Sequence, residues 1–252
     1  MTKTVIVTGA AGGMGLEVLR ILAQRDVNVA CVDLDESLLS QAIAGLGKTR
    51  GEFLAFGADV SDEAAVRRYV GKTVEVLGGL QGIFNIAGVE GELLPVREAT
   101  VENFDRVMGI NARSVFLNMK HGAPHLIDAG GGAVVSTGSY LATRGVPLCG
   151  PYGASKHAIV GLTKSFALEM AEHNVRANVV APGAMDTRMI RAMFEAISDD
   201  TGEAEAKMVQ AIPQRRMADP REAAAAGVWL LLDAPSHITG QVLRVDGGLS
   251  AA

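Results

Sequence analysis

Short apolar runs rich in β-branched residues alternate along the chain with longer stretches in which apolar residues recur at helical spacing. The short runs predict strands over residues 4–8, 27–32, 53–58, 82–86, 133–137, 177–181 and 242–245. The longer stretches predict helices over residues 14–24, 36–44, 62–77, 101–127, 152–173 and 220–232. Pro124 is expected to kink or shorten the fourth helix, because proline removes a backbone hydrogen bond. Such alternation is typical of an α/β fold in which a parallel sheet of about seven strands carries helices on both faces.

The alternation is interrupted by no linker, repeat or low-complexity tract, so residues 1–252 are predicted to form one domain. The least regular segment is 187–213, which holds two shorter helical patterns, 189–197 and 202–212. An insertion between a late strand and a late helix often closes over a ligand, which predicts a substrate lid here. The alternative is a surface excursion that packs against a neighbouring subunit.

Composition narrows the class of protein. With 252 residues, 48% of them hydrophobic, the chain can bury a large core. Its net charge is −5 and no segment gathers Lys and Arg, which disfavours nucleic-acid and membrane-surface partners. No apolar run approaches the length of a membrane span, and the N-terminus lacks the pattern of a secretory signal. The two cysteines, Cys31 and Cys149, are expected to be free thiols in a cytoplasmic protein.

A glycine-rich turn follows the first predicted strand. After Thr8 come Gly9, Gly13, Met14 and Gly15, and a helical pattern begins at once. Glycines at these positions let the backbone approach a pyrophosphate, whose charge is favoured by a helix N-terminus. Taken alone, the turn is also compatible with a tight strand-to-helix connection that binds nothing.

Asp33 ends the second predicted strand, close to the offset of about 20 residues that a dinucleotide site requires. A carboxylate there accepts hydrogen bonds from the adenosine ribose and repels a 2′-phosphate. Leu34 follows it where a basic residue would favour NADP, so the sequence predicts NAD. Asp59 and Val60 are predicted to hold the adenine, with capping of the next helix as an alternative role for Asp59.

Tyr152 and Lys156 lie four residues apart on a predicted helix and therefore share one face. Such a pair is common by chance. It gains meaning from Ser139, which follows the fifth strand, and from Asn111 in the preceding long helix.

These ordered motifs resemble the short-chain dehydrogenase/reductase family over essentially the whole chain. The resemblance is carried by Thr8-Gly9-x-x-x-Gly13-x-Gly15, Asp33, Asp59, Asn85-Ile86-Ala87-Gly88, Asn111, Ser139, Tyr152-x-x-x-Lys156, Pro182-Gly183 with Thr187, and Asp246-Gly247-Gly248. Ile86 departs from the family's usual second asparagine, which puts the local hydrogen bonding in question. The resemblance implies a Rossmann-like, doubly wound fold. It also implies an NAD site that includes Asn85, Ala87, Gly88, Pro182, Gly183 and Thr187.

The resemblance also implies the catalytic roles. Tyr152 is expected to be the general acid/base, and Lys156 to tune it and hold the nicotinamide ribose. A tyrosine titrates at about 10 unperturbed, and a neighbouring ammonium and an oxidised nicotinamide both lower that pKa. Ser139 is expected to hydrogen-bond the reacting oxygen, and Asn111 to support a water that connects Lys156 to solvent. Thr187 and the backbone after Pro182 would hold the carboxamide.

The residues expected around the substrate are mostly apolar and uncharged: Ser139, Tyr140, Leu148, Tyr152, Met185, Met189 and Met193. They favour a small, neutral secondary alcohol or ketone, with a cyclic compound as one possibility. The pattern is similar to that of bacterial reductases of cyclic ketones and of cyclohexanol dehydrogenases. Family members usually form tetramers through the helices that correspond to 101–127 and 152–173, so a homotetramer is expected.

Three alternatives remain open at this point. The first is a 3-oxoacyl carrier-protein reductase, which Asp33 disfavours because those enzymes usually prefer NADP. The second is a non-catalytic dinucleotide sensor, and the third is a lyase or dehalogenase on the same scaffold. The complete catalytic set disfavours the sensor, and the intact glycine turn disfavours the lyase. No metal site is expected, because no acid or cysteine completes a ligand set with His121 and His125. His157 is expected to face away from Tyr152.

Overall fold

The computed structural model describes residues 2–251 and contains the predicted parallel sheet. Its strands pair in the order β3-β2-β1-β4-β5-β6-β7, and each neighbouring pair is parallel. The strands are β1 Lys3–Thr8, β2 Val27–Asp33, β3 Phe53–Gly57, β4 Gly82–Asn85, β5 Gly132–Thr137, β6 Val175–Pro182 and β7 Val242–Val245. The predicted doubly wound, single-sheet architecture is confirmed.

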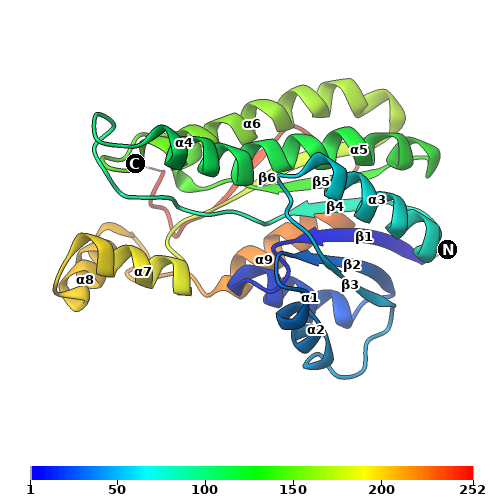
Figure 1. The fold of residues 1–252 in the computed structure, drawn as a ribbon, viewed down its shortest axis with the longest axis horizontal. Coiled ribbons are helices and arrows are strands. Elements are labelled where there is room, and N and C mark those ends of the chain that lie inside the picture. Colours follow the sequence, from blue (N-terminus) through cyan, green and yellow to red (C-terminus); the bar gives the residue numbers. More distant parts are fainter. Residues whose placement is uncertain (1, 252) are drawn as a thin grey trace.

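Helices cover both faces of this sheet (Figure 1). They are α1 Gly13–Ala23, α2 Glu36–Ala44, α3 Glu63–Leu77, α4 Val101–Met108, α5 Ser114–Asp128, α6 Gly150–Met170, α7 Arg188–Ile197, α8 Thr201–Ala211 and α9 Pro220–Val228. In Figure 1, α3 to α6 lie on one side of the sheet and α1, α2 and α9 on the other. Strands buried on both faces explain why the sequence shows continuous apolar runs instead of alternation.

The strands divide their side chains between two cores. In β1, Ile6 packs into the core under α3, α5 and α6, whereas Val5 and Val7 pack into the core under α1 and α9. Successive residues of a strand point to opposite faces, so one short segment contributes to both layers.

The long helix predicted over 101–127 is helical throughout but not uniform. A π-turn, Gly109–Arg113, separates α4 from α5. The prediction that Pro124 shortens the helix is wrong, since Pro124 lies inside α5 and the helix continues to Asp128. Leu126, fully buried in the core, anchors the turn beyond the proline and offsets the lost backbone hydrogen bond.

The order of the strands places a crevice at the carboxyl edge of the sheet, between β1 and β4. The chain winds outward through β2 and β3 on one side of this point and through β5, β6 and β7 on the other. Thr8 and Asn85, the last residues of β1 and β4, pair in register beside it. Ligands of doubly wound sheets bind at such a switch point.

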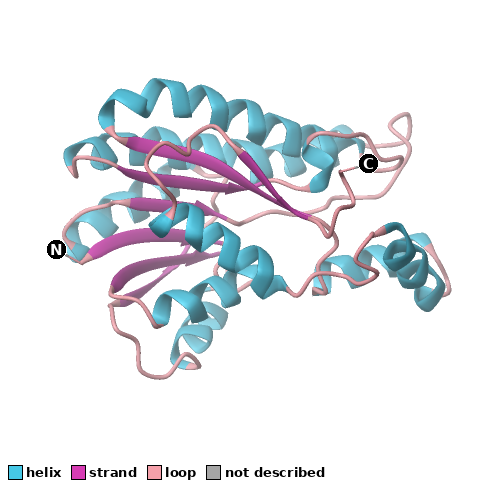
Figure 2. Cartoon of the chain, turned by 180° about the vertical axis from the view of Figure 1, so that it is seen from behind, coloured by secondary structure: helices cyan, strands magenta, loops and turns pink. Residues whose placement is uncertain are grey.

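The predicted segment 187–213 forms the two helices α7 and α8, which project beyond the body of the protein (Figure 1, Figure 2). Among the residues of these two helices, Phe194 alone is buried. The two helices are therefore attached to the domain over a small apolar contact. Within residues 2–251, no helix combines the length and apolar character that a bilayer crossing requires.

Candidate active site

The glycine-rich turn after β1 brings the N-terminus of α1 to the crevice. Gly9 has φ +65°, and a Cβ there would lie 2.7 Å from the backbone nitrogen of Ala87. A Cβ on Gly15 would overlap the carbonyl oxygen of Gly9. Both positions therefore require glycine, and the backbone N–H groups beside them form a cradle of the kind that binds a pyrophosphate. The Met14 side chain packs into the core, so only its backbone is available to a cofactor.

Asp33 ends β2 beside this turn. Its Oδ2 accepts a hydrogen bond from the Ala11 N–H at 2.8 Å, and its Oδ1 accepts one from the Leu34 N–H at 2.8 Å. Leu34 is 76% exposed at the rim of the crevice. The pair fits the adenosine end of a nicotinamide dinucleotide, because it offers a carboxylate to the ribose hydroxyls and an apolar surface to the adenine.

Asp59 and Val60 follow β3 on the same edge. Oδ1 of Asp59 accepts hydrogen bonds from the N–H and the hydroxyl of Ser61, at 2.8 and 2.7 Å. The alternative that Asp59 caps α3 is wrong, since the helix begins later and Asp62 is its cap, accepting from the Ala64 N–H. Val60 is buried in the core, so its side chain is not available to a cofactor.

The segment after β4 is tied directly to β1. The Thr8 hydroxyl accepts hydrogen bonds from the N–H groups of Ile86 and Ala87, at 3.2 and 3.4 Å. The backbone bonding of this loop is thus intact in spite of Ile86, whose side chain packs against the core. Asn85 donates through Nδ2 to Ser136 Oγ at 3.3 Å, and its buried Oδ1 has no partner among residues 2–251.

The end of β6 completes the crevice. A Cβ on Gly183 would lie 2.9 Å from the Cα of Asp246, so glycine lets the loops after β6 and β7 approach each other. Thr187 caps α7, and its Oγ1 accepts a hydrogen bond from the Ile190 N–H at 3.5 Å. Its methyl group faces the glycine turn, since a Cβ on Gly13 would lie 3.2 Å from Thr187 Cγ2. The predicted cofactor residues are therefore gathered around one crevice from the ends of several strands.

Ser139, Tyr152 and Lys156 meet between the end of β5 and the first turns of α6. Lys156 Nζ lies 5.4 Å from the centroid of the Tyr152 ring and donates a hydrogen bond to the Thr137 carbonyl at 2.8 Å. Pro151 in the first turn of α6 fixes where the helix begins, and the helical spacing then places Tyr152 and Lys156 on one face. Ser139 Oγ accepts a hydrogen bond from the Leu141 N–H at 3.2 Å, which holds the hydroxyl at the site.

Burial is the main cause of the pKa shifts of Tyr152 and Lys156. Tyr152 is half-buried, but its hydroxyl lies at the covered end, and burial raises its pKa to about 12. The Ser139 hydroxyl acts in the opposite direction, and the charge of Glu90 adds to the increase. Burial also lowers the pKa of Lys156 to about 8. Among the protein's own groups, therefore, burial raises the Tyr152 pKa, in the direction opposite to the lowering expected from the nearby lysine.

The arrangement has a counterpart in known proteins. A family model described as enoyl-(acyl carrier protein) reductase matches residues 9–250, nearly the whole chain. This chain belongs to the short-chain dehydrogenase/reductase family. It is therefore an oxidoreductase that acts on small molecules and binds a nicotinamide dinucleotide.

Several short-chain dehydrogenases are similar in sequence to this chain over nearly their whole length. The 2,5-dichloro-2,5-cyclohexadiene-1,4-diol dehydrogenase of Sphingobium indicum is 37% identical over 99% of this chain and 97% of that protein. Levodione reductase of Leifsonia aquatica is 36% identical over 99% and 95%, and cyclohexanol dehydrogenase of an Acinetobacter species is 33% identical over 99% and 95%.

Solved structures agree with these relatives. A crystal structure of levodione reductase superposes with a TM-score of 0.94 at 33% identity, covering 100% of this chain and 99% of that one. NAD⁺-bound xylitol dehydrogenase gives 0.89 at 31% identity, covering 98% of both chains. NADP-bound ElxO gives 0.90 at 27% identity, covering 100% of both. The family thus includes structures with either dinucleotide.

Asn111 occupies the π-turn between α4 and α5 and is fully buried. Its Oδ1 accepts from the Val89 N–H, and its Nδ2 donates to the Val89 carbonyl, both at 2.8 Å. Nδ2 also lies 3.0 Å from Ser155 Oγ. The side chain therefore holds the loop after β4 against α6, next to Lys156. The role in a water chain stays a prediction. π-turns are rare in proteins, and they occur frequently at functional sites.

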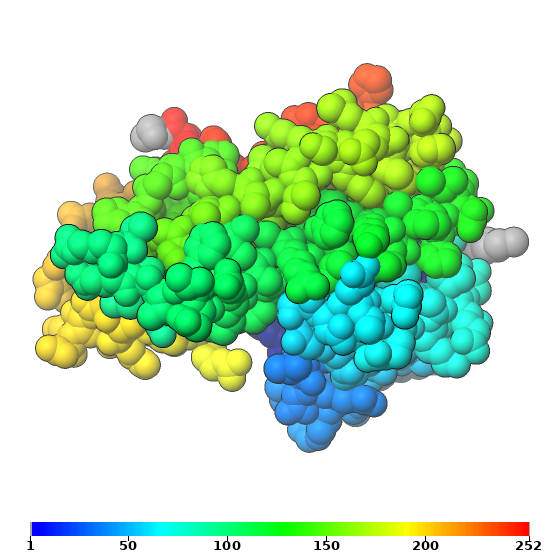
Figure 3. Space-filling model, turned by 45° about the horizontal axis from the view of Figure 1, so that its top comes forward, coloured from blue at the N-terminus to red at the C-terminus, as the bar shows by residue number. Residues whose placement is uncertain are grey.

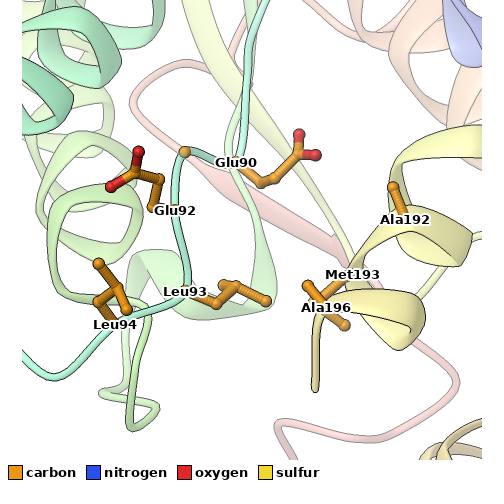
Figure 4. A pocket seen from close by; sticks show the side chains of 8 residues that line it. Glu90, Glu92, Leu93, Leu94, Ala192, Met193 and Ala196 are labelled. Carbon is orange, nitrogen blue, oxygen red and sulfur yellow. The ribbon is translucent and has the colours of Figure 1, made fainter. Parts of the chain in front are cut away.

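The side chains predicted to contact substrate lie on both sides of the crevice. Tyr140 and Leu148 come from the loop between β5 and α6, and Leu148 has φ +68° and is partly exposed. Met185 packs partly against the core, Met189 is exposed, and Met193 lines a cavity of about 310 Å³ between α7 and the loop after β4 (Figure 4). These assignments remain predictions.

Sequence reasoning missed the other walls of this cavity. Glu90, Leu93 and Leu94 come from the loop after β4, and Ala192 and Ala196 from α7. A single glutamate in a loop has no periodicity that would mark it. The usable signal is its position directly after the Asn85–Gly88 motif, at the carboxyl end of a central strand.

The remaining candidates lie outside the site or make structural contacts. His157 is exposed on α6, and its Nδ1 lies 2.9 Å from the Gly153 carbonyl. His121 Nε2 lies 3.1 Å from Glu63 Oε1 on the outer helices. Burial raises the pKa of the Cys149 thiol, which keeps it in the unreactive form. Within residues 2–251, no three side chains of His, Cys, Asp or Glu converge as metal ligands would.

Proposed function

We propose that this enzyme uses NAD to interconvert a small, mostly apolar secondary alcohol, cyclic in its preferred form, with the corresponding ketone. The observation that carries the proposal is the convergence of Asp33 and the Tyr152–Lys156 pair on one crevice, beside a cavity lined mainly by apolar side chains. The volume of about 310 Å³ is in the range of small-molecule sites. Relatives named for cyclohexanol, levodione and a cyclohexadienediol support a ring.

NAD is preferred over NADP because of the local charge at the end of β2. A 2′-phosphate at this point would meet the Asp33 carboxylate, and residues 9–15 hold no Lys or Arg that could neutralise it. Leu34, the next residue, offers no charge either. The occurrence of both dinucleotides in related structures makes this local chemistry the deciding argument.

The protein's own groups bind, orient and exchange the proton. The nicotinamide, when bound, supplies or accepts the hydride. Tyr152 gives its phenolic proton to the carbonyl oxygen during reduction and takes it back during oxidation. Ser139 donates a hydrogen bond to the same oxygen, and Lys156 holds the ribose and favours the phenolate electrostatically. Thr187 and the backbone after Pro182 hold the carboxamide.

The first test is an initial-rate assay that follows absorbance of the reduced nicotinamide. Wild-type protein receives NAD or NADP with a panel of cyclic and linear secondary alcohols. We expect turnover with NAD, a kcat/KM for NAD at least tenfold above that for NADP, and faster oxidation of cyclic alcohols than of linear ones. A preference for NADP would overturn the cofactor proposal, and tight NAD binding without turnover of any alcohol would favour the sensor.

The cofactor assignment is tested directly at the end of β2. In the double variant Asp33→Ser/Leu34→Arg, the carboxylate is removed and a cation is supplied, so preference is expected to move toward NADP by roughly a hundredfold in kcat/KM. Glu36→Gln, at the start of α2, changes a nearby carboxylate without touching the turn and serves as the control. Unchanged NAD preference in the double variant would contradict the role of Asp33.

We also propose a homotetramer. Apolar side chains stand exposed on the outer helices, including Val101 and Phe104 of α4, Phe116 of α5 and Leu168 of α6, which is 81% exposed. Figure 3 shows the face on which α5 and α6 lie side by side. Apolar side chains that gather into one exposed patch mark subunit interfaces. Light scattering on a sizing column is expected to give four times the chain mass, and a monomer at all concentrations would refute the assembly.

A carrier-protein reductase is the rival enzyme. Its substrate arrives on a phosphate-bearing arm, and the Glu90 carboxylate lies in the wall of the cavity through which such an arm would enter. Like charges disfavour that approach. A 3-oxoacyl thioester that reacts faster than every free alcohol or ketone in the panel would reverse this conclusion.

A further inference from the structure

The loop after β4 holds Glu90 in a fixed position. On one side, the backbone of Val89 forms two hydrogen bonds with the Asn111 side chain, both 2.8 Å long. On the other, the Glu92 N–H donates to Asn103 Oδ1 at 3.2 Å, and the Leu94 N–H donates to the Leu148 carbonyl at 3.1 Å. A residue anchored before and after in this way presents its side chain in one direction.

Gly91 decides that direction. Its φ is +75°, and a Cβ there would lie 3.0 Å from Asn103 Oδ1, so the tight turn requires glycine. As a result, the flanking glutamates diverge. In Figure 4, the Glu90 side chain extends toward Ala192 of α7, whereas the Glu92 side chain turns to the opposite side of the loop.

The surroundings of Glu90 leave its carboxylate free to accept hydrogen bonds. The residue is half-buried in the wall of the 310 Å³ cavity, and across the cavity it faces Ala192, Met193 and Ala196. Among residues 2–251, no Lys, Arg or His nitrogen comes within 4.0 Å of the Glu90 carboxylate. Its negative charge is nevertheless felt at the reacting end of the site, where it raises the pKa of Tyr152.

From this geometry, we infer that Glu90 selects substrates with a second hydroxyl group, remote from the carbon that is oxidised, so that the preferred substrates are compact diols. The inference rests on the proposed alcohol dehydrogenase function and refines its substrate class. A hydroxyl group that enters an otherwise apolar cavity needs an acceptor, and a carboxylate is the strongest acceptor a protein offers.

Charge disfavours the other ligands that a carboxylate could take. An amino alcohol would bring an ammonium into a site that already holds the Lys156 amine and a cationic oxidised nicotinamide. A hydroxy acid would bring a second negative charge next to Glu90. A neutral diol satisfies the carboxylate and meets neither repulsion.

The test compares two substrates of similar shape, cyclohexane-1,4-diol and 4-methylcyclohexanol, in which a hydroxyl replaces a methyl group. The measured quantity is the ratio of their kcat/KM values with NAD. Wild-type enzyme is expected to favour the diol. Glu90→Gln is expected to lower the ratio about threefold, and Glu90→Leu about tenfold or more, because the leucine offers no acceptor. Glu92→Gln is the matched control, since its side chain points away, and it should leave the ratio unchanged.

A second readout separates this role from a merely structural one. Alcohol oxidation speeds up as Tyr152 loses its proton, so the rising limb of the pH–rate profile reports the Tyr152 pKa. The groups that act on that phenol are Ser139, Tyr140, Glu90, Cys149 and the facing amine of Lys156. Because Glu90 raises the pKa, Glu90→Gln should shift the limb to lower pH, while Glu92→Gln should not.

The outcomes distinguish failure of the diol inference from failure of the alcohol dehydrogenase function on which it rests. If wild-type enzyme oxidises 4-methylcyclohexanol as well as the diol, and Glu90→Leu leaves the ratio unchanged, the diol inference is wrong while the alcohol dehydrogenase function stands. If neither alcohol reacts although NAD binds, the proposed function itself fails. A preference for 4-aminocyclohexanol that disappears in Glu90→Gln would replace the diol with a cationic substrate. Thermal melting of each variant confirms that the fold is retained.

Discussion

The two sides of the active-site crevice differ in how firmly they are held. Lys156, Ser139 and Asn111 are each less than a tenth exposed and lie in the packed body of the domain. On the opposite side, α7 and α8 bury the single side chain of Phe194. The groups proposed to carry out the chemistry are thus fixed by the core, whereas the wall proposed to contact the substrate is attached weakly. A change of substrate range can therefore be made on the weakly held side without disturbing the reacting groups.

The largest effect is expected from a substitution on the firmly held side of the crevice. Tyr152→Phe removes the hydroxyl proposed to exchange the proton, and kcat should fall by roughly a thousandfold while NAD affinity is retained. Steady-state rates together with NAD titration by fluorescence measure both quantities.

The control removes a different buried hydroxyl from the same body of the protein. Tyr69 donates to Asn118 Oδ1 at 2.6 Å, far from the crevice, and Tyr69→Phe should cost about 1 kcal/mol of unfolding free energy but leave kcat within about twofold. If Tyr152→Phe retained most of the wild-type rate, another group would have to be the acid/base.

The next effect concerns the burial of Lys156. Its pKa falls from 10.5 to about 8 on folding, so between these values the unfolded chain binds more protons than the folded one. Stability linked to this group therefore rises with pH over that window, by about 3 kcal/mol at most. We expect the unfolding free energy of wild type, relative to Lys156→Met, to increase between pH 8 and pH 10.5 in urea titrations.

An exposed lysine supplies the comparison. Lys72 on α3 is about half exposed, and the same urea titrations on Lys72→Met give the comparison for a lysine that the fold does not bury. A flat difference between wild type and Lys156→Met would mean that the Lys156 amine is solvated in the folded protein.

The smallest expected effects are on the weakly held side. Met193→Ala should raise KM for the alcohol by a few-fold without changing Tm, because it removes a cavity wall but no core packing. Phe194→Ala removes the buried anchor of α7, and hydrogen exchange should then speed up in α7 and α8 while the sheet keeps its protection. Loss of protection in β4 or β5 in this variant would show that α7 and α8 unfold together with the central sheet.

Most of the fold could be predicted from the sequence because its strands are buried on both faces. β1, β2 and β5 appear as continuous apolar runs, and their observed ends differ from the predicted ones by one residue at most. The π-turn around Asn111 could not be predicted, since the apolar spacing passes through 101–127 without a break. The helix continues past Pro124 because Leu126 packs into the core, and this contact cannot be predicted from local helix propensity.

The residues of the candidate site also fall into those that the sequence predicts and those that it does not. Gly9, Gly15 and Asp33 stand in an ordered motif, and their positions follow from the sequence. Glu90 does not, because its place opposite Ala192 depends on the φ of Gly91 and on contacts with α4 that no local pattern records. The pKa of Tyr152 also depends on depth of burial, a property of the assembled structure.

Thr187 belongs to both sides at once. It caps the first turn of α7, and its methyl group stands next to Gly13 in the glycine-rich turn. A dinucleotide bound at the glycine-rich turn would therefore also act on the first turn of α7, and by reciprocity an ordered α7 would hold the dinucleotide more tightly. The expected kinetic signature is compulsory order: the dinucleotide enters first and leaves last, and the alcohol comes and goes between these two events.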